Sequence, residues 1–142
     1  FEIEKVFAIR LTHKADLLDE LNQFCADNNI KNGFISLIGS VSSINLSYYE
    51  QDNLRYIDIQ NNNFDKNKGL EIVSATGNIS IKDDKPFVHI HVIVSDEQGN
   101  CFAGHLSKGT KTFAGEAIIQ KFKGQEDLVR AFDDETKLSL WK

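Results

Sequence analysis

The segment Pro86–Leu106 reads PFVHIHVIVSDEQGNCFAGHL and contains three of the four histidines in this 142-residue chain. Two apolar runs flank a polar break that includes Gly99, and this pattern is typical of a β-hairpin. Alternate residues of a strand face opposite sides of a sheet, so His89 and His91 are expected to share one face. The rest of the chain is interpreted around this hairpin.

The length of the turn decides where the third histidine points. If residues 97–99 form a three-residue loop with its glycine in the left-handed conformation, Asp96 faces Asn100. His91 then lies opposite His105, and all three imidazoles share one face. A four-residue loop would place His105 on the other face. The position of the glycine favours the three-residue loop.

Three imidazoles on one rigid face form a donor set suited to Zn²⁺ or another divalent transition metal. The sequence therefore predicts a metal site at His89, His91 and His105, with a fourth coordination position open to water or a ligand. In the alternative interpretation, these histidines are polar side chains at a subunit contact or on a solvated face. Glu71 and Glu116 are candidate general bases, but the sequence places neither beside the metal, and no catalytic residue is identified.

Composition indicates one ordinary globular domain over residues 1–142, because 41% of the residues are apolar and 26% are charged. The sequence contains no run of about 18 apolar residues, so no membrane span is predicted, and no signal peptide is visible. Cys25 and Cys101 both lie in apolar surroundings and are expected to be free, buried and reduced. This cysteine usage favours a cytoplasmic location.

The formal net charge is −5, from 21 acidic and 16 basic residues. Affinity for DNA comes mainly from neutralising phosphates, so this charge opposes non-specific DNA binding.

Hydrophobic periodicity divides the first half of the chain into four elements and a loop. The expected elements are a strand at residues 1–11 with a bulge near Glu4-Lys5, an amphipathic helix at 15–26 capped by Thr12, a strand at 33–41 with a bulge or a close backbone contact at Gly39-Ser40, a hairpin at 44–50 and 54–60, and a loop at 61–69.

The second half adds further strands to the same sheet. Residues 70–81 are read as a strand pair or as one long strand bent at Gly77, and residues 112–122 as a strand. Glu116 in that strand belongs either to a sheet edge or to a site, and the edge is favoured. A short helix is expected at 125–132, followed by a tail anchored by Leu138, Leu140 and Trp141. The predicted fold class is α+β, with a mostly antiparallel central sheet and one main flanking helix.

An ordered set of motifs spans nearly the whole chain and resembles the plants-and-prokaryotes conserved domain (PPC domain). The matching positions are Gly39-Ser40-Val41, Glu71–Ile79, Pro86, His89-Ile90-His91, Asp96, Gly99, Gly104-His105-Leu106, Gly109, Glu116, Arg130, Asp133, Thr136 and Leu140.

The resemblance implies a homotrimer of α/β subunits with a central antiparallel sheet. Plant members carry the domain behind AT-hooks in nuclear DNA-binding proteins, and stand-alone prokaryotic members are often called predicted DNA-binding proteins. Some prokaryotic members are similar to metal-binding proteins with histidines at the positions of His89, His91 and His105. This chain has no AT-hook, and the segment Lys68–Val73 keeps only Glu71 and Ile72 of a plant motif that contacts transcription factors.

Three functions remain open from the sequence. The first is a DNA-associated regulatory homotrimer with a three-histidine metal site. The second is a metal-dependent enzyme or small-molecule binder that uses His89, His91 and His105. The third is a trimeric scaffold without metal.

Overall fold

The computed structural model describes residues 1–59, 65 and 68–142, and within them it forms one helix and ten strands. In chain order the elements are β1 (Glu2–Arg10), α1 (Leu17–Asp27), β2 (Gly33–Ser43), β3 (Leu46–Glu50), β4 (Arg55–Asp58), β5 (Leu70–Lys82), β6 (Lys85–Ser95), β7 (Cys101–Leu106), β8 (Lys111–Lys123), β9 (Arg130–Phe132) and β10 (Ser139–Trp141). Eight strands form one sheet in the order β1-β8-β2-β5-β6-β7-β3-β4, and β9 pairs with β10. Every strand pairing is antiparallel, which confirms the predicted fold class.

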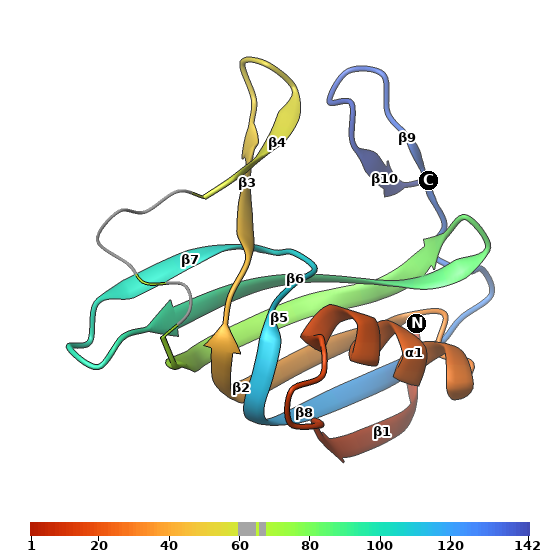
Figure 1. The fold of residues 1–142 in the computed structure, drawn as a ribbon. Helices are drawn as coiled ribbons and strands as arrows, with labels where there is room; N and C mark the ends of the chain where they lie inside the picture. Colours follow the sequence, from red (N-terminus) through yellow and green to blue (C-terminus); the bar gives the residue numbers. More distant parts are fainter. Residues whose placement is uncertain (60–64, 66–67) are drawn as a thin grey trace.

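The hydrophobic core lies between α1 and one face of the large sheet (Figure 1). Leu17, Leu21 and Cys25 on the helix are all buried, because they recur at helical spacing on one side. They pack into a cluster with alternate residues of the strands, such as Ile35 and Ile90. Each such fully buried aliphatic side chain contributes about 1.5–3 kcal/mol relative to exposure.

The helix begins after Asp16 and not after Thr12, so the predicted cap is wrong. The Asp16 carboxylate accepts a hydrogen bond from the Asp19 amide at 3.1 Å and another from the Gly109 amide at 2.7 Å. Lys14, with φ of 67°, turns the chain between the two candidate caps. Asp16 therefore caps α1 and ties it to the segment before β8.

Residues 70–82 form one continuous strand, and its irregularity lies between Ile72 and Ser74 instead of at Gly77. Gly77 serves a different purpose: a Cβ at this position would collide with the His89 carbonyl oxygen and the Ile90 side chain. The predicted bulges near Glu4-Lys5 and at Gly39 are both observed as register shifts.

Glu116 is not at a sheet edge, because β8 lies between β1 and β2. Its exposed carboxylate projects from the middle of the sheet, opposite Arg10 on one side and Ile38 on the other. A carboxylate in a central strand is compatible with this fold because that face of the sheet is not covered by α1.

The segment predicted as a helix at 125–132 is extended, and its end forms β9. Its backbone is bonded to distant residues and not to itself: the Leu128 amide donates to Asn32 Oδ1 at 2.6 Å, and the Leu128 carbonyl accepts from the Ile81 amide at 2.8 Å. Leu140 and Trp141 remain exposed, so they anchor the tail less completely than expected.

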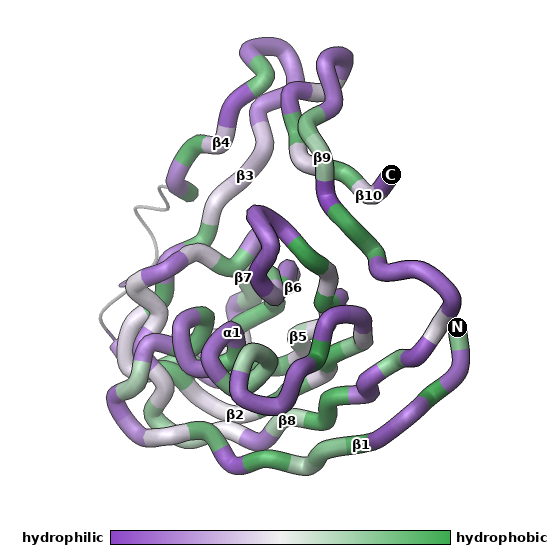
Figure 2. Tube along the Cα trace, turned by 90° about the vertical axis from the view of Figure 1, so that its right-hand side faces the viewer, coloured by the Kyte–Doolittle hydropathy of each residue, from purple (hydrophilic) through white to green (hydrophobic). Residues whose placement is uncertain are grey.

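Two hairpin arms leave the large sheet on the same side (Figure 1). One arm is β3–β4 with its turn at residues 51–54, which confirms the predicted hairpin, and the other is β9–β10. Figure 2 shows both arms extending beyond the body that contains α1. The Tyr49 hydroxyl donates to the Thr136 carbonyl and links the arms to each other.

Three further expectations concern the loop, the thiols and the membrane. The loop predicted at residues 61–69 falls mostly on residues outside the described part of the chain. Cys25 is buried as predicted, but Cys101 is exposed at the start of β7, near the tip of its hairpin. In the described residues no helix has the length and apolar character that crossing a membrane requires.

Candidate metal centre

The turn between β6 and β7 sets the position of the histidines. Its Asp96 amide donates to the Asn100 carbonyl at 3.1 Å, and Gly99 has φ of 84°. The Asp96 carboxylate also accepts from the side-chain and backbone amides of Asn100 and from the Gln98 amide. These hydrogen bonds, led by the Asn100 side chain, hold the pKa of Asp96 below its ordinary value. The predicted three-residue loop is therefore confirmed.

This register places His91 directly opposite His105. His89 lies two residues before His91 and therefore on the same face of β6, away from the buried Val88 and Ile90. The ring centroids of the three imidazoles are 4.8 to 5.6 Å apart. The three histidines therefore share one face of the sheet, as the sequence predicts.

One nitrogen from each ring lies within 4.8 Å of the others. His89 Nε2 and His91 Nε2 are 3.2 Å apart. In a tetrahedral zinc site with metal–nitrogen bonds of about 2.0–2.1 Å, ligand nitrogens lie about 3.3 Å apart. The His89–His91 nitrogen pair already has this spacing, and the His105 nitrogen lies within 4.8 Å of both, so the third ring needs to move closer to complete such a site.

His105 gives a second sign of fit. Its Nδ1 atom is buried and has no hydrogen-bond partner in the described part of the protein. A buried polar atom without a partner costs free energy, whereas a nitrogen that ligates a metal needs no such partner. The ring environment is therefore compatible with metal ligation.

The surroundings of His89 and His105 favour the neutral form of these two imidazoles. Burial, followed by the charges of His105, Arg130 and His91, lowers the pKa of His89 to about 4. Burial, followed by His91 and Arg130, also lowers the pKa of His105. Neutral imidazole is the form that binds metals, so no proton needs to be displaced from these two rings near neutral pH.

The trio opens into a cavity of about 610 Å³ beneath the β3–β4 arm. Aromatic rings form one side of it: Tyr56 lies 5.0 Å from the His105 ring and 5.0 Å from Tyr49. Burial, followed by the neighbouring Tyr49, raises the pKa of Tyr56. None of the described residues that line this cavity is a carboxylate.

Neither candidate general base lies near the trio. Glu71 pairs with Ser95, whereas His91 pairs with Thr76, five residues further along β5, or about 16 Å. Glu116 lies on β8, three strands away from β6, a spacing of about 14 Å. The structure brings together the three histidines but not the two glutamates.

Arg130 is the main site neighbour that sequence reasoning did not assign to the site. Its guanidinium donates to Ser80 Oγ at 2.7 Å, to the Ser139 carbonyl at 2.9 Å and to Asn78 Oδ1 at 2.8 Å, and its Nη2 atom is 3.4 Å from His89 Nδ1. Arg130 therefore holds the β9–β10 arm against β5 and the His89 ring. The sequence feature that could have pointed to Arg130 is its position as a single arginine between the apolar residues Leu128, Val129, Ala131 and Phe132.

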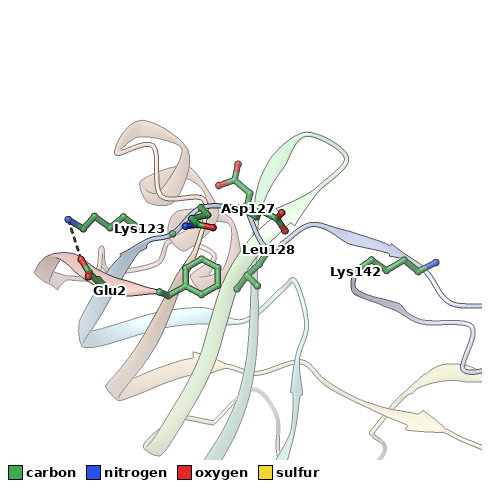
Figure 3. A pocket seen from close by; sticks show the side chains of 9 residues that line it. Glu2, Lys123, Asp127, Leu128 and Lys142 are labelled. Carbon is green, nitrogen blue, oxygen red and sulfur yellow. Dashed lines mark ion pairs between the residues drawn. The ribbon is translucent and has the colours of Figure 1, made fainter.

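A larger cavity of about 830 Å³ is lined by residues from both ends of the chain, among them Phe1 and Lys142. Figure 3 shows the ion pair between Glu2 and Lys123 at its rim, with Asp127, Leu128 and Lys142 further along. Its charges are mixed, and its lining residues include no histidine or cysteine. It does not compete with the histidine cavity as a candidate site.

Comparison with known proteins identifies relatives of the whole fold. The model of the Plants and Prokaryotes Conserved (PCC) domain matches residues 1–123. A bifunctional protein GlmU from Synechococcus sp. (strain JA-3-3Ab) is 30% identical over 116 residues, which cover 81% of this chain and 17% of that protein. The chain thus spans about a sixth of the length of the curated relatives it matches.

Several solved structures have a similar fold that covers the full length of this chain. A metal-containing protein from Archaeoglobus fulgidus is 37% identical with a TM-score of 0.91, covering 100% of this chain and 96% of that one. A plant- and prokaryote-conserved protein from Pyrococcus horikoshii is 30% identical with a TM-score of 0.90, covering 100% and 94%. A proposed DNA-binding protein from Bacteroides thetaiotaomicron, 23% identical with a TM-score of 0.86 and coverage of 100% and 94%, shares the fold. The chain therefore belongs to the PCC domain family.

Proposed function

We propose that the protein binds one divalent transition metal ion, with zinc as the best fit, through His89, His91 and His105, and uses it to hold a small molecule. The observation that carries this proposal is the convergence of three imidazoles in one pocket, with the His89 and His91 nitrogens 3.2 Å apart. The similarity to the metal-containing Archaeoglobus protein supports it.

Three protein ligands leave a coordination position for a ligand atom, and a bound metal supplies Lewis acidity there. The cavity of about 610 Å³ in front of the trio has room for such a molecule. No carboxylate of the described residues lines it, so a general base of that kind is absent from its described walls. Ligand binding is therefore the function that the site supports best, ahead of hydrolysis.

The test is metal content per chain, measured by elemental mass spectrometry after zinc incubation and desalting. We expect about one zinc per wild-type chain and a clear loss in a folded His91→Ala variant. The exposed His13 lies outside the trio, with Nδ1 2.8 Å from the Phe113 carbonyl, so His13→Ala is the matched control. Unchanged zinc content in His91→Ala would overturn the proposed site.

The homotrimer remains part of the proposal, supported by the face of the sheet opposite α1. Large apolar side chains on β1, β2 and β8 alternate with core residues there and remain exposed: Val6, Phe34, Ile38 and Ile118. Large exposed apolar surfaces on soluble proteins often mark contacts between proteins, so this set is a candidate subunit contact. The histidines lie on the same face of the sheet, so copies packed on this surface would border the metal site.

DNA association is a second candidate, supported by the proposed DNA-binding proteins with this fold. The net charge of −5 opposes it. Fluorescence anisotropy of a labelled duplex at about 50 mM salt tests it, because electrostatic binding is strongest there. Absence of a signal at micromolar protein would remove direct DNA binding and leave the metal site unaffected.

A further inference from the structure

A second cavity, of about 270 Å³, lies behind the histidines on the side of the β9–β10 arm. It shares Tyr56, His89, His105 and Leu138 with the histidine cavity of about 610 Å³. These four side chains therefore form a common boundary of the two cavities.

The second cavity is lined by two cations, Lys82 and Arg130. The Lys82 ammonium lies 5.2 Å from the Phe87 ring centroid, and the Arg130 guanidinium lies 5.2 Å from the same centroid on this wall. Neither cation forms an ion pair within the described part of the chain. Two uncompensated positive charges therefore converge on one apolar wall.

This arrangement contrasts with the rest of the protein. Acidic residues outnumber basic residues by 21 to 16 in the chain, yet no described residue that lines either cavity is a carboxylate. The partners of Arg130 are a hydroxyl, an amide oxygen, a carbonyl and an imidazole nitrogen, which fix its orientation but do not neutralise it. A partly buried charge without a counter-ion is unfavourable, and an anion bound there would offset that cost.

We propose that the second cavity binds the carboxylate or phosphate group of a small ligand, with Lys82 and Arg130 as the anion-recognising residues. Phe87, Leu138 and Leu140 line the same cavity and would contact the apolar part of the ligand. This inference rests on the proposed function, since the ligand's other end would occupy the position in front of the three histidines.

The experiment is isothermal titration calorimetry with benzoate, phenyl phosphate and the neutral analogue benzamide, each against zinc-loaded and metal-free protein. The three probes share a ring and differ in charge. We expect at least one of the two anions to bind about tenfold more tightly than benzamide, because hydrogen bonds to charged groups are the stronger kind. The tighter anion identifies whether carboxylate or phosphate is preferred.

The variant is Lys82→Gln, which removes one charge without touching the hydrogen bonds of Arg130. Affinity for the anion should fall about tenfold, while benzamide binding stays the same. Lys85→Gln is the matched control: Lys85 faces Lys82 across the turn between β5 and β6 but does not line the cavity. Binding in the control should stay close to the wild-type value at about 0.15 M salt.

Equal affinity for the anions and benzamide would overturn the anion site, and so would unchanged anion binding in Lys82→Gln. These results are distinct from failure of the metal proposal, which appears as zero zinc per chain. The metal-free titrations still test the two cations in that case, because charge preference and the Lys82→Gln effect do not require the ion.

Discussion

The side chains of Cys25 and Cys101 have the same chemistry and different environments. Burial raises the pKa of the Cys25 thiol to about 12, whereas Cys101 is exposed on β7. Since only the thiolate is nucleophilic, Cys25 should stay unreactive in the native protein. We expect one fast thiol per chain with a disulfide-exchange reagent at pH 8, and a second thiol after denaturation.

Cys101→Ser should abolish the fast reaction, and Cys25→Ala should leave it in place. Two fast thiols in the native wild-type protein would contradict the packing of Cys25 between α1 and the sheet. The same raised pKa implies that the free energy of unfolding falls as the pH rises above about 9, because the unfolded state ionises first.

Gly77 shows how one residue positions the site. A methyl group there would meet the carbonyl of His89 and the side chain of Ile90. We expect Gly77→Ala to lower the free energy of unfolding by about 1–3 kcal/mol in urea denaturation, as overpacking does. Gly69→Ala is the control, since a methyl group at that position meets only the Val41 carbonyl at 3.9 Å.

Equal stability of the two glycine variants would contradict the close approach of β5 and β6 at this point. If Gly77→Ala folds, it should also bind zinc more weakly, because the collision displaces the backbone of His89.

At the scale of elements, the sequence was most informative where structure is local. The β6–β7 register follows from Asp96, Gly99 and Asn100, which are close in sequence and bond to one another. The faces of the histidines then follow from strand alternation alone. The candidate site could therefore be predicted from the residues of one hairpin.

Prediction failed where distant partners decide the conformation. Residues 125–132 have helical spacing of apolar side chains, but the backbone of Leu128 forms its hydrogen bonds with Asn32 and Ile81 and not within a helix. Strand order is also non-local, so Glu116 was expected at an edge when β8 is central. Arg130 was not connected to the site because β9 reaches His89 only through the tertiary fold.

The start of α1 provides a test at the same scale. Asp16→Ala should cost about 1–2 kcal/mol of stability, because its carboxylate caps the helix and also holds the Gly109 amide. Thr12→Ala should cost much less, since the helix does not begin there. Thermal unfolding of both variants measures the difference. A larger loss of stability for Thr12→Ala would contradict Asp16 as the helix cap and favour Thr12 instead.

At the scale of the whole molecule, one face of the sheet is covered by α1 and the other carries both the histidines and exposed apolar residues. Ile118 is 45% exposed in the middle of that second face. If copies of the chain pack there, Ile118→Asp should convert a trimer into smaller species in light scattering, because a charge would be buried in the contact.

Leu54→Asp is the control for assembly, because Leu54 is similarly exposed at 41% but lies in the turn of the β3–β4 arm. A wild-type protein that is monomeric at all concentrations would contradict the trimer directly.

The central claim is that His89, His91 and His105 bind one metal ion with a position left open. X-ray absorption spectroscopy of the zinc-loaded protein tests it most directly. We predict one zinc per chain with a four-coordinate shell of nitrogen and oxygen at about 2.0–2.1 Å and the scattering signature of three imidazoles. Sulfur in the first shell, an oxygen-only shell, or no retained zinc would contradict the site.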